Sequence, residues 1–412
     1  TGWPSEGRMR EDALPSKTNQ ALFVREFVKL AQERNWNYNI IEAFDQPWKR
    51  LSEGAVGGYW GFFDKDRLDK NVFKGDVSDF PNYRYLGFGS ILLVLVFSLL
   101  LKNSTISTKK VVLFTFINTL FAILYMLQME QFNITVRTSG EITWATLVLL
   151  THLALYYLVL SNIANNSKPA IVPIREILKE KHINANTLPM ILFYSSFIFV
   201  LISTIILAFE GRYRNFEVYI FAISAISFVL LYGGRFGNMG FKAFEKLSFL
   251  ILLVTSGISY YNEGSLNIYS NVWIVIALIF TFILFRGSNN SSFAELKNII
   301  KYIVIFFAVT ISLRYGFIAN KEIITQCHLN DDTLICGIKD AIGYWGYIGV
   351  FGVIAIIIST IALFVNNKKF GIIALFTSIF AIMMFNTYVG SIAFILILMI
   401  LCKEENLKAL NS

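Results

Sequence analysis

LPMILFYSSFIFVLISTIILAF, residues 188–209, contains no charged side chain and is long enough to cross a lipid bilayer as a helix. About 20 apolar residues span the hydrocarbon core. Ten further apolar runs, several of them shorter, lie at 86–101, 111–129, 142–161, 218–233, 247–261, 269–285, 299–318, 341–365, 372–385 and 388–401. The pattern predicts a mainly α-helical, polytopic membrane protein with about eleven transmembrane helices.

The last two runs leave an alternative open. Asn386 and Thr387 separate residues 372–385 from residues 388–401, and each run is shorter than a full span. They are either two short helices or one long tilted helix.

Composition separates the membrane part from the N-terminal part. Of 412 residues, 55% are hydrophobic and 16% charged, and the formal net charge is +8. Residues 1–85 hold 13 Lys and Arg and 13 Asp and Glu, so the positive surplus belongs to the membrane part. A surplus placed there indicates orientation in the bilayer, and no nucleic-acid partner is expected.

The loop charges predict the orientation. If the N-terminal segment lies outside and the runs alternate, 17 Lys and Arg fall in inside loops. Outside loops then hold five: Arg137, Arg212, Arg214, Lys321 and Lys339. Because basic loops stay on the cytoplasmic side, residues 1–80 are expected in the periplasm and the C-terminus in the cytoplasm.

Residues 1–85 have a different pattern. Pro15-Ser16 precedes a helical spacing in which Phe23, Phe27, Leu30 and Ala31 share a face. In residues 36–44, aromatic and aliphatic side chains alternate with asparagines, which predicts a strand. A strand end, a helix and a strand in this order fit the last βα units of a (β/α)8 barrel, in which strand ends carry the active site.

Two motifs carry a family resemblance. Thr1-Gly2-Trp3-Pro4-Ser5 and residues 40–49, IIEAFDQPWK, resemble the family 17 glycoside hydrolases, the β-1,3-glucanases, and in particular bacterial membrane-bound members described as β-(1,6)-glucan synthases. In that family the glutamate of Glu-Thr-Gly-Trp-Pro-Ser is the nucleophile, and the acid/base lies on an earlier strand. The resemblance implies an N-terminally truncated fragment with its nucleophile just before Thr1. No catalytic carboxylate is then expected in this chain, which alone should be inactive.

The resemblance also implies a rim of sugar-binding residues. Aromatic rings would stack on sugar faces, and polar side chains would bind hydroxyls; the candidates are Trp3, Phe44, Asp45, Gln46, Trp48, Lys49 and Glu53. Gln46 stands where plant members have an acidic residue, a departure that leaves hydrogen bonding but removes charge. The alternative is that the aromatics are packing residues and that Lys49 is a solvated surface lysine.

Outside this rim, three features of the membrane part lead to expectations of their own. Cys327 and Cys336 share an outside loop and are expected to form a disulfide, the alternative being two free thiols. The turn at 209–216, FEGRYRNF, is either a headgroup or capping contact or a surface for docking a glycan or the N-terminal domain. Arg314 is expected to extend toward the membrane surface.

These patterns predict four regions: residues 1–80 as a periplasmic barrel remnant, 81–85 as a linker, 86–402 as the membrane domain and 403–412 as a cytoplasmic tail. The leading hypothesis is a protein of a bacterial inner membrane that cleaves or transfers β-1,3-glucan by retaining double displacement in its intact form. The alternatives are a membrane glucan synthase and a non-enzymatic glucan-export channel or scaffold. The expected partners are a β-glucan oligosaccharide or polysaccharide, the lipid bilayer and a glucan synthesis or export complex, without a cofactor or metal.

Overall fold

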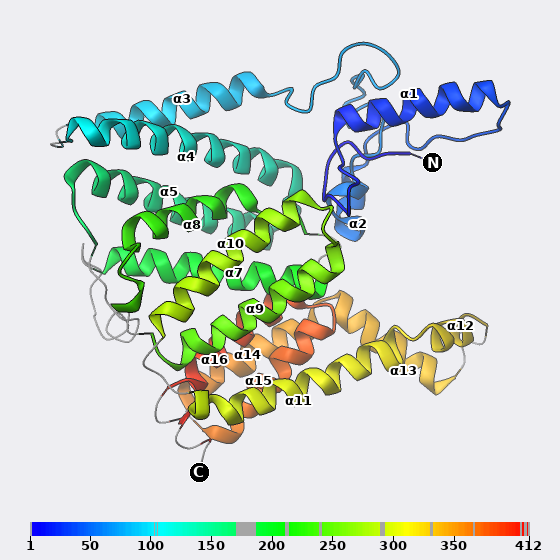
Figure 1. Ribbon diagram of the computed structural model, residues 1–412. Coiled ribbons are helices and arrows are strands. Elements are labelled where there is room, and N and C mark those ends of the chain that lie inside the picture. The colour runs from blue at the N-terminus through cyan, green and yellow to red at the C-terminus, as the bar shows by residue number, and fades with distance from the viewer. Residues whose placement is uncertain are drawn as a thin grey trace. The chain divides into compact units, whose positions relative to one another are not determined.

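The computed structural model describes the chain except for residues 1, 103, 105, 170–186, 211–213, 239–240, 289–292, 330–332, 366, 404–405, 408–409 and 411–412. Figure 1 shows an assembly of helices. The described residues contain no β-strand, only isolated bridges such as the one between Phe44 and Phe63. The predicted barrel remnant, including the strand at 36–44, is therefore wrong.

Within the N-terminal segment, residues 2–80, one helix matches its prediction. Helix α1 (Lys17–Glu33) begins at Ser16, whose hydroxyl accepts a hydrogen bond from the Asn19 amide at 3.1 Å. Its buried residues are Gln20, Ala21, Val24 and Ala31 rather than the large apolar side chains of the predicted face. A 3-10 turn (Pro47–Lys49) leads into the short helix α2 (Arg50–Gly57), and the remainder is irregular.

The chain divides into two compact units, and the division passes through helices α7 (Leu188–Glu210), α9 (Ala243–Glu263) and α10 (Ile268–Gly287). The first unit contains residues 1–199, 211–236 and 259–280. Its complete helices beyond α2 are α3 (Tyr83–Leu100), α4 (Thr108–Thr135), α5 (Ser139–Asn165) and α8 (Val218–Tyr232).

Aromatic side chains join the helices of the first unit. Tyr156 on α5 packs against Phe97 on α3, with ring centroids 4.3 Å apart. The same tyrosine donates a hydrogen bond of 2.6 Å to the carbonyl of Asn118 on α4. On α5, buried His152 contacts Ser224 on α8 through a ring nitrogen, so this histidine is a packed, hydrogen-bonded core residue.

The second unit contains residues 200–210, 237–258 and 281–412. Its complete helices are α11 (Lys297–Leu313), α12 (Lys321–Leu329), α13 (Leu334–Tyr347), α14 (Val350–Val365), α15 (Lys368–Met383) and α16 (Thr387–Leu401). Small residues bring α14, α15 and α16 together around the fully buried Ala355, Ala381 and Ala393. Arg314, at the end of α11, donates to the Met383 carbonyl at 3.0 Å and lies over the Phe385 ring.

Fewer helices are long enough to span a membrane than the eleven predicted. Seven of the described helices are long and apolar enough to cross a membrane, or eight if the pair α13 and α14, bent by 65°, is one span. Helices α8 and α16 have 15 residues each and cover only about 22 Å at 1.5 Å per residue. The last two apolar runs are separate helices, because the chain turns at Phe385 with φ at 65°.

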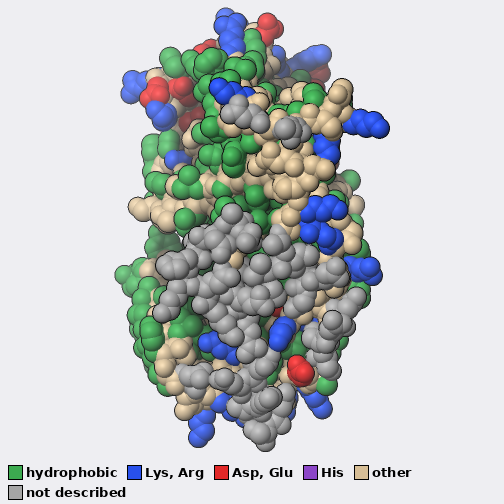
Figure 2. All heavy atoms as spheres, turned by 90° about the vertical axis from the view of Figure 1, so that its left-hand side faces the viewer, with side chains coloured by type: hydrophobic (Ala, Val, Ile, Leu, Met, Phe, Trp, Pro, Cys, Tyr) green, Lys and Arg blue, Asp and Glu red, His purple; other side chains and the backbone are tan. Residues whose placement is uncertain are grey.

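The surfaces of the spanning helices suit lipid. On α3, Phe88 is 70% exposed and Leu99 is 65% exposed. In Figure 2, hydrophobic side chains cover much of the described surface in view. Acyl chains would cover such side chains, whereas water would not solvate them well. The helices therefore indicate a membrane protein.

Candidate functional site

The N-terminal segment is held together by side chains that bind backbone carbonyls. Gln20, fully buried on α1, donates to the carbonyls of Trp3, Trp60 and Gly61 at 2.9–3.2 Å. Backbone amides pair some carbonyls of this irregular segment, such as those of Tyr59 and Phe63, and the Gln20 side chain supplies donors to others. Gln20 thereby fixes the start of the segment against residues 60–61.

Arg25, also on α1, does the same for a second loop. Its guanidinium donates to the carbonyls of Asn71, Val72 and Gly75 at 2.7–3.0 Å. These bonds hold residues 71–75 against α1.

Trp3 and Asp45, two of the predicted sugar-binding residues, are engaged inside this segment. Trp3 is half-buried, packs against Phe23 with ring centroids 5.6 Å apart, and donates from Nε1 to the Leu14 carbonyl at 3.1 Å. Asp45 is 7% exposed and forms an ion pair of 2.9 Å with Lys70. Burial raises the pKa of Asp45 against the opposing effect of Lys70, and burial lowers the pKa of Lys70.

Gln46 and Lys49 both bind the carboxylate of Glu42, a residue outside the predicted sugar-binding set. Gln46 donates from Nε2 to Glu42 at 2.6 Å, and Lys49 forms an ion pair with the other oxygen of the same carboxylate. The side chains of Lys49 and Glu42 are 29% and 16% exposed, so the pair borders solvent. Lys49 therefore pairs with Glu42, whereas Glu53 is exposed on α2.

Two aromatic residues near Glu42 in the sequence are exposed. Trp48 is 68% exposed and Phe44 is 44% exposed. Phe44 packs at 5.6 Å on Phe63, and the Arg67 guanidinium lies 5.8 Å from its ring centroid. Glu42, Gln46 and Lys49, together with Phe44 and Trp48, make up the 42–49 cluster, a stretch of eight residues that offers acceptors, donors and exposed ring faces.

No sequence pattern singles out Glu42 as a partner of Gln46 and Lys49. It lies four residues before Gln46 and seven before Lys49, a spacing that has meaning on a helix. Here the backbone between Glu42 and Pro47 is irregular, so only the folded chain brings the three side chains together.

Within the first unit, the N-terminal segment is bonded to turns at one end of the spanning helices. Arg8, 4% exposed, forms an ion pair with Glu263 and donates to the Arg214 carbonyl at 2.6 Å. Asn267, just before α10, donates to the Met9 carbonyl at 2.9 Å. One role predicted for the turn at 209–216 was docking of the N-terminal domain, and Arg214 of this turn does contact the N-terminal segment. Arg212 and Tyr213 lie outside the described residues.

Helices α4 and α5 complete this contact. Arg50 on α2 donates to the Ile134 carbonyl at 2.9 Å, and Arg137 donates to the Arg50 carbonyl at 2.8 Å. Arg137 and Arg214 also pair with Glu141 at 2.5 and 3.2 Å. The ends of α4, α5, α8, α9 and α10 that meet the segment must lie on one side of the membrane.

Cys327 on α12 and Cys336 on α13 form a disulfide in the second unit, with Cα atoms 5.5 Å apart. His328 follows Cys327 directly in the sequence. Across the part of the chain that the structure describes, no group of three or more His, Cys, Asp or Glu side chains could hold a metal ion.

The comparisons with known proteins point to glucan chemistry over a short stretch. The chain is 39% identical over 67 residues to a glucan 1,3-beta-glucosidase of Saccharomyces cerevisiae (strain ATCC 204508 / S288c). The match covers 15% of this chain and 21% of the yeast protein, so the chain spans about a fifth of that relative's length. No family model matches the chain, and no solved structure matches it.

Proposed function

We propose that this chain is a membrane-anchored part of a β-glucan-processing protein, in which the 42–49 cluster binds the glucan. The single observation that carries the proposal is that the bonded Glu42–Gln46–Lys49 set borders solvent within the same eight-residue stretch that carries the exposed rings of Phe44 and Trp48. Sugar hydroxyls need donors and acceptors, and the apolar faces of pyranose rings stack on aromatics. The local similarity to a glucan 1,3-beta-glucosidase supports this substrate class.

Lys49 and Gln46 have a definite role in this proposal. Both donate to Glu42, so the carboxylate is held in one orientation while its remaining lone pairs accept sugar hydroxyls. Trp48 provides the ring face nearest to solvent. In the intact protein, glucan held here would be cleaved or transferred by retaining double displacement with carboxylates from elsewhere in the protein.

The proposal places residues 1–80 in the periplasm of a bacterial inner membrane. The excess of Lys and Arg in the opposite loops supports it. Single cysteines at 265 and at 108, in a background without Cys402, should react differently with an impermeant maleimide in spheroplasts. Labelling at 265 alone supports this orientation, and labelling at 108 alone contradicts it.

Binding of β-1,3-gluco-oligosaccharides to the purified chain in nanodiscs tests the glucan site. Trp48→Ala should weaken binding about tenfold, because it removes the stacking ring. Lys49→Met should weaken it about three- to tenfold, because Glu42 loses its charged partner. Lys29→Met, at an exposed position on α1, is the matched control. Equal small effects at positions 29, 48 and 49 would remove the 42–49 cluster from the site.

A further inference from the structure

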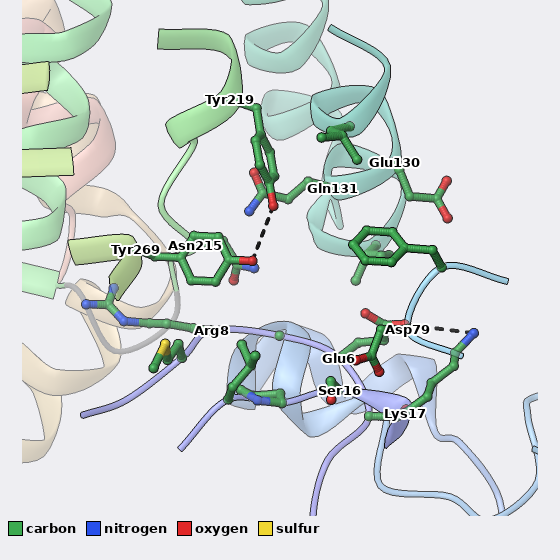
Figure 3. A pocket seen from close by; sticks show the side chains of 18 of the residues that line it. Glu6, Arg8, Ser16, Lys17, Asp79, Glu130, Gln131, Asn215, Tyr219 and Tyr269 are labelled. Carbon is green, nitrogen blue, oxygen red and sulfur yellow. Dashed lines mark hydrogen bonds and ion pairs between the residues drawn. The ribbon is translucent and has the colours of Figure 1, made fainter. Parts of the chain in front are cut away.

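A cavity of 260 Å³ lies in the first unit, outside the 42–49 cluster. Figure 3 shows its wall built from the N-terminal segment, the adjoining residues 81–82, the end of α4, the turn before α8 and the start of α10. Volumes of about 300–1,000 Å³ hold drug-sized ligands, so this one suits a single small ring.

Hydrogen-bonding groups line the cavity. The Tyr219 and Tyr269 hydroxyls lie 3.2 Å apart and face the interior in Figure 3. Asn215 supplies a half-buried amide beside them. Hydroxyls and an amide can each donate and accept, so this wall suits a ligand that does both.

The opposite wall carries three carboxylates. Glu130 accepts from the Asn82 amide at 2.7 Å, and Asp79 accepts from the Thr18 backbone amide at 2.8 Å. Each retains a further oxygen lone pair for a ligand. Burial raises the pKa of Glu6 to about 7, above the opposing effect of Lys17. Near neutrality Glu6 is therefore present both as an acid that donates and as a carboxylate that accepts.

The charges of the lining disfavour an anion. Lys17 lies 4.0 Å from Glu6, and Arg8 pairs with Glu263, so the basic groups are already matched to carboxylates. Glu130 and Asp79 then leave the lining with a negative excess. A phosphate would be repelled, whereas a neutral polyhydroxyl ligand would not.

An aromatic ring stands at the opening. Phe80 lines the cavity and yet remains 56% exposed. A ring in this position can cover the apolar face of a sugar whose hydroxyls reach the polar walls.

We infer that this cavity is a second sugar subsite, which holds one glucose unit of a β-glucan chain where the N-terminal segment meets the spanning helices. The inference rests on the proposed glucan function and extends it by a position at the membrane surface. A chain bound at the 42–49 cluster and a unit bound in the cavity are separate events, so variants can distinguish them.

Titration of the purified full chain in nanodiscs with laminaritriose tests the inference. Phe80→Ala and Asn215→Ala should each weaken binding about three- to tenfold. Phe88→Ala, an aromatic 70% exposed on α3 and absent from the lining, is the control and should leave binding unchanged. Circular dichroism and gel filtration establish that the variants fold. A laminaritriose carrying a photoreactive diazirine should label the peptides that contain Phe80 or Tyr269.

Each outcome bears on the inference. Loss of affinity in both cavity variants, with labelling of the Phe80 or Tyr269 peptide, supports it. If only Trp48→Ala weakens binding and the cavity peptides stay unlabelled, the inference is overturned while the proposed function stands. If the unmodified chain does not bind the sugar, the inference and the proposed function both fail. Labelling that phosphatidylglycerol vesicles suppress, but unlabelled laminaritriose does not, would make the cavity a lipid-headgroup site and overturn the inference.

Discussion

The N-terminal segment and the spanning helices solve the same hydrogen-bonding problem in opposite ways. In the segment, long polar side chains such as Gln20 and Arg25 reach across the fold to bind carbonyls of irregular backbone. In the helices, carbonyls away from the helix ends are paired within their own helix, and α14, α15 and α16 pack through small residues such as Ala355 and Ala393. Stability is therefore concentrated in a few side chains in the segment and spread along the chain in the membrane.

The largest effect is expected at Gln20. Gln20→Ala removes the side-chain donor to the Trp3 and Gly61 carbonyls, while Trp60 keeps its bond from the Glu42 amide, and should destabilise the N-terminal segment by about 3 kcal/mol. Hydrogen exchange of residues 2–80 measures this. Gln32→Ala, at an exposed position of the same helix, should change exchange little. Equal protection in both variants would show that Gln20 does not hold the segment.

The second-largest effect is expected at the disulfide, which restrains helix ends rather than helix interiors. It closes a separation of nine residues between α12 and α13. Cys327→Ser with Cys336→Ser should cost roughly 2–3 kcal/mol through the greater freedom of the unfolded chain. A reductant should lower the melting temperature of the unmodified protein and leave that of the double variant unchanged. A double variant that remains sensitive to the reductant would contradict this assignment.

A smaller effect tests the packing of small residues in the helices. A Cβ at Gly390 on α16 would lie 2.8 Å from the Ile382 amide nitrogen of α15, so Gly390→Ala should cost about 2 kcal/mol. Gly343→Ala on α13 meets no atom within 4 Å and should be neutral or slightly stabilising. Thermal denaturation of the two variants in the same detergent compares them. Similar melting temperatures would mean that α15 and α16 do not pack so closely.

The smallest effect concerns pH. The pKa of Glu6 rises on folding from 4.5 to about 7, so the folded state holds the proton more tightly than the unfolded state. The associated stability is fully present below about pH 4.5 and is lost as the pH rises through about 7. Thermal denaturation at pH 5 and pH 8 should show a loss of about 1–2 kcal/mol, which Glu6→Gln reduces. An unchanged pH dependence in that variant would place the titration elsewhere, for instance at Glu217, whose pKa burial also raises to about 7.

Local sequence patterns succeeded where the structure is local. Apolar runs became helices, and Ser16 begins α1 as its position before a helical spacing predicts. The alternation at Trp36 and Tyr38 failed, because a strand requires hydrogen bonds from a neighbouring strand. The two side chains are instead 45% and 44% exposed, on irregular backbone. The barrel expectation followed from that strand and was wrong with it.

The sequence by itself determined that this chain has helices apolar enough to enter a membrane, and where most of those helices lie. These properties follow from hydropathy, capping and residue chemistry within short windows. Only the tertiary structure decided that Lys49 and Gln46 meet at Glu42, that Asp45 is buried against Lys70, and that Glu6 and Tyr269 line one cavity. Residues joined by irregular backbone, or far apart in the sequence as Glu6 and Tyr269 are, become neighbours only when folding of the whole unit fixes the path of the chain.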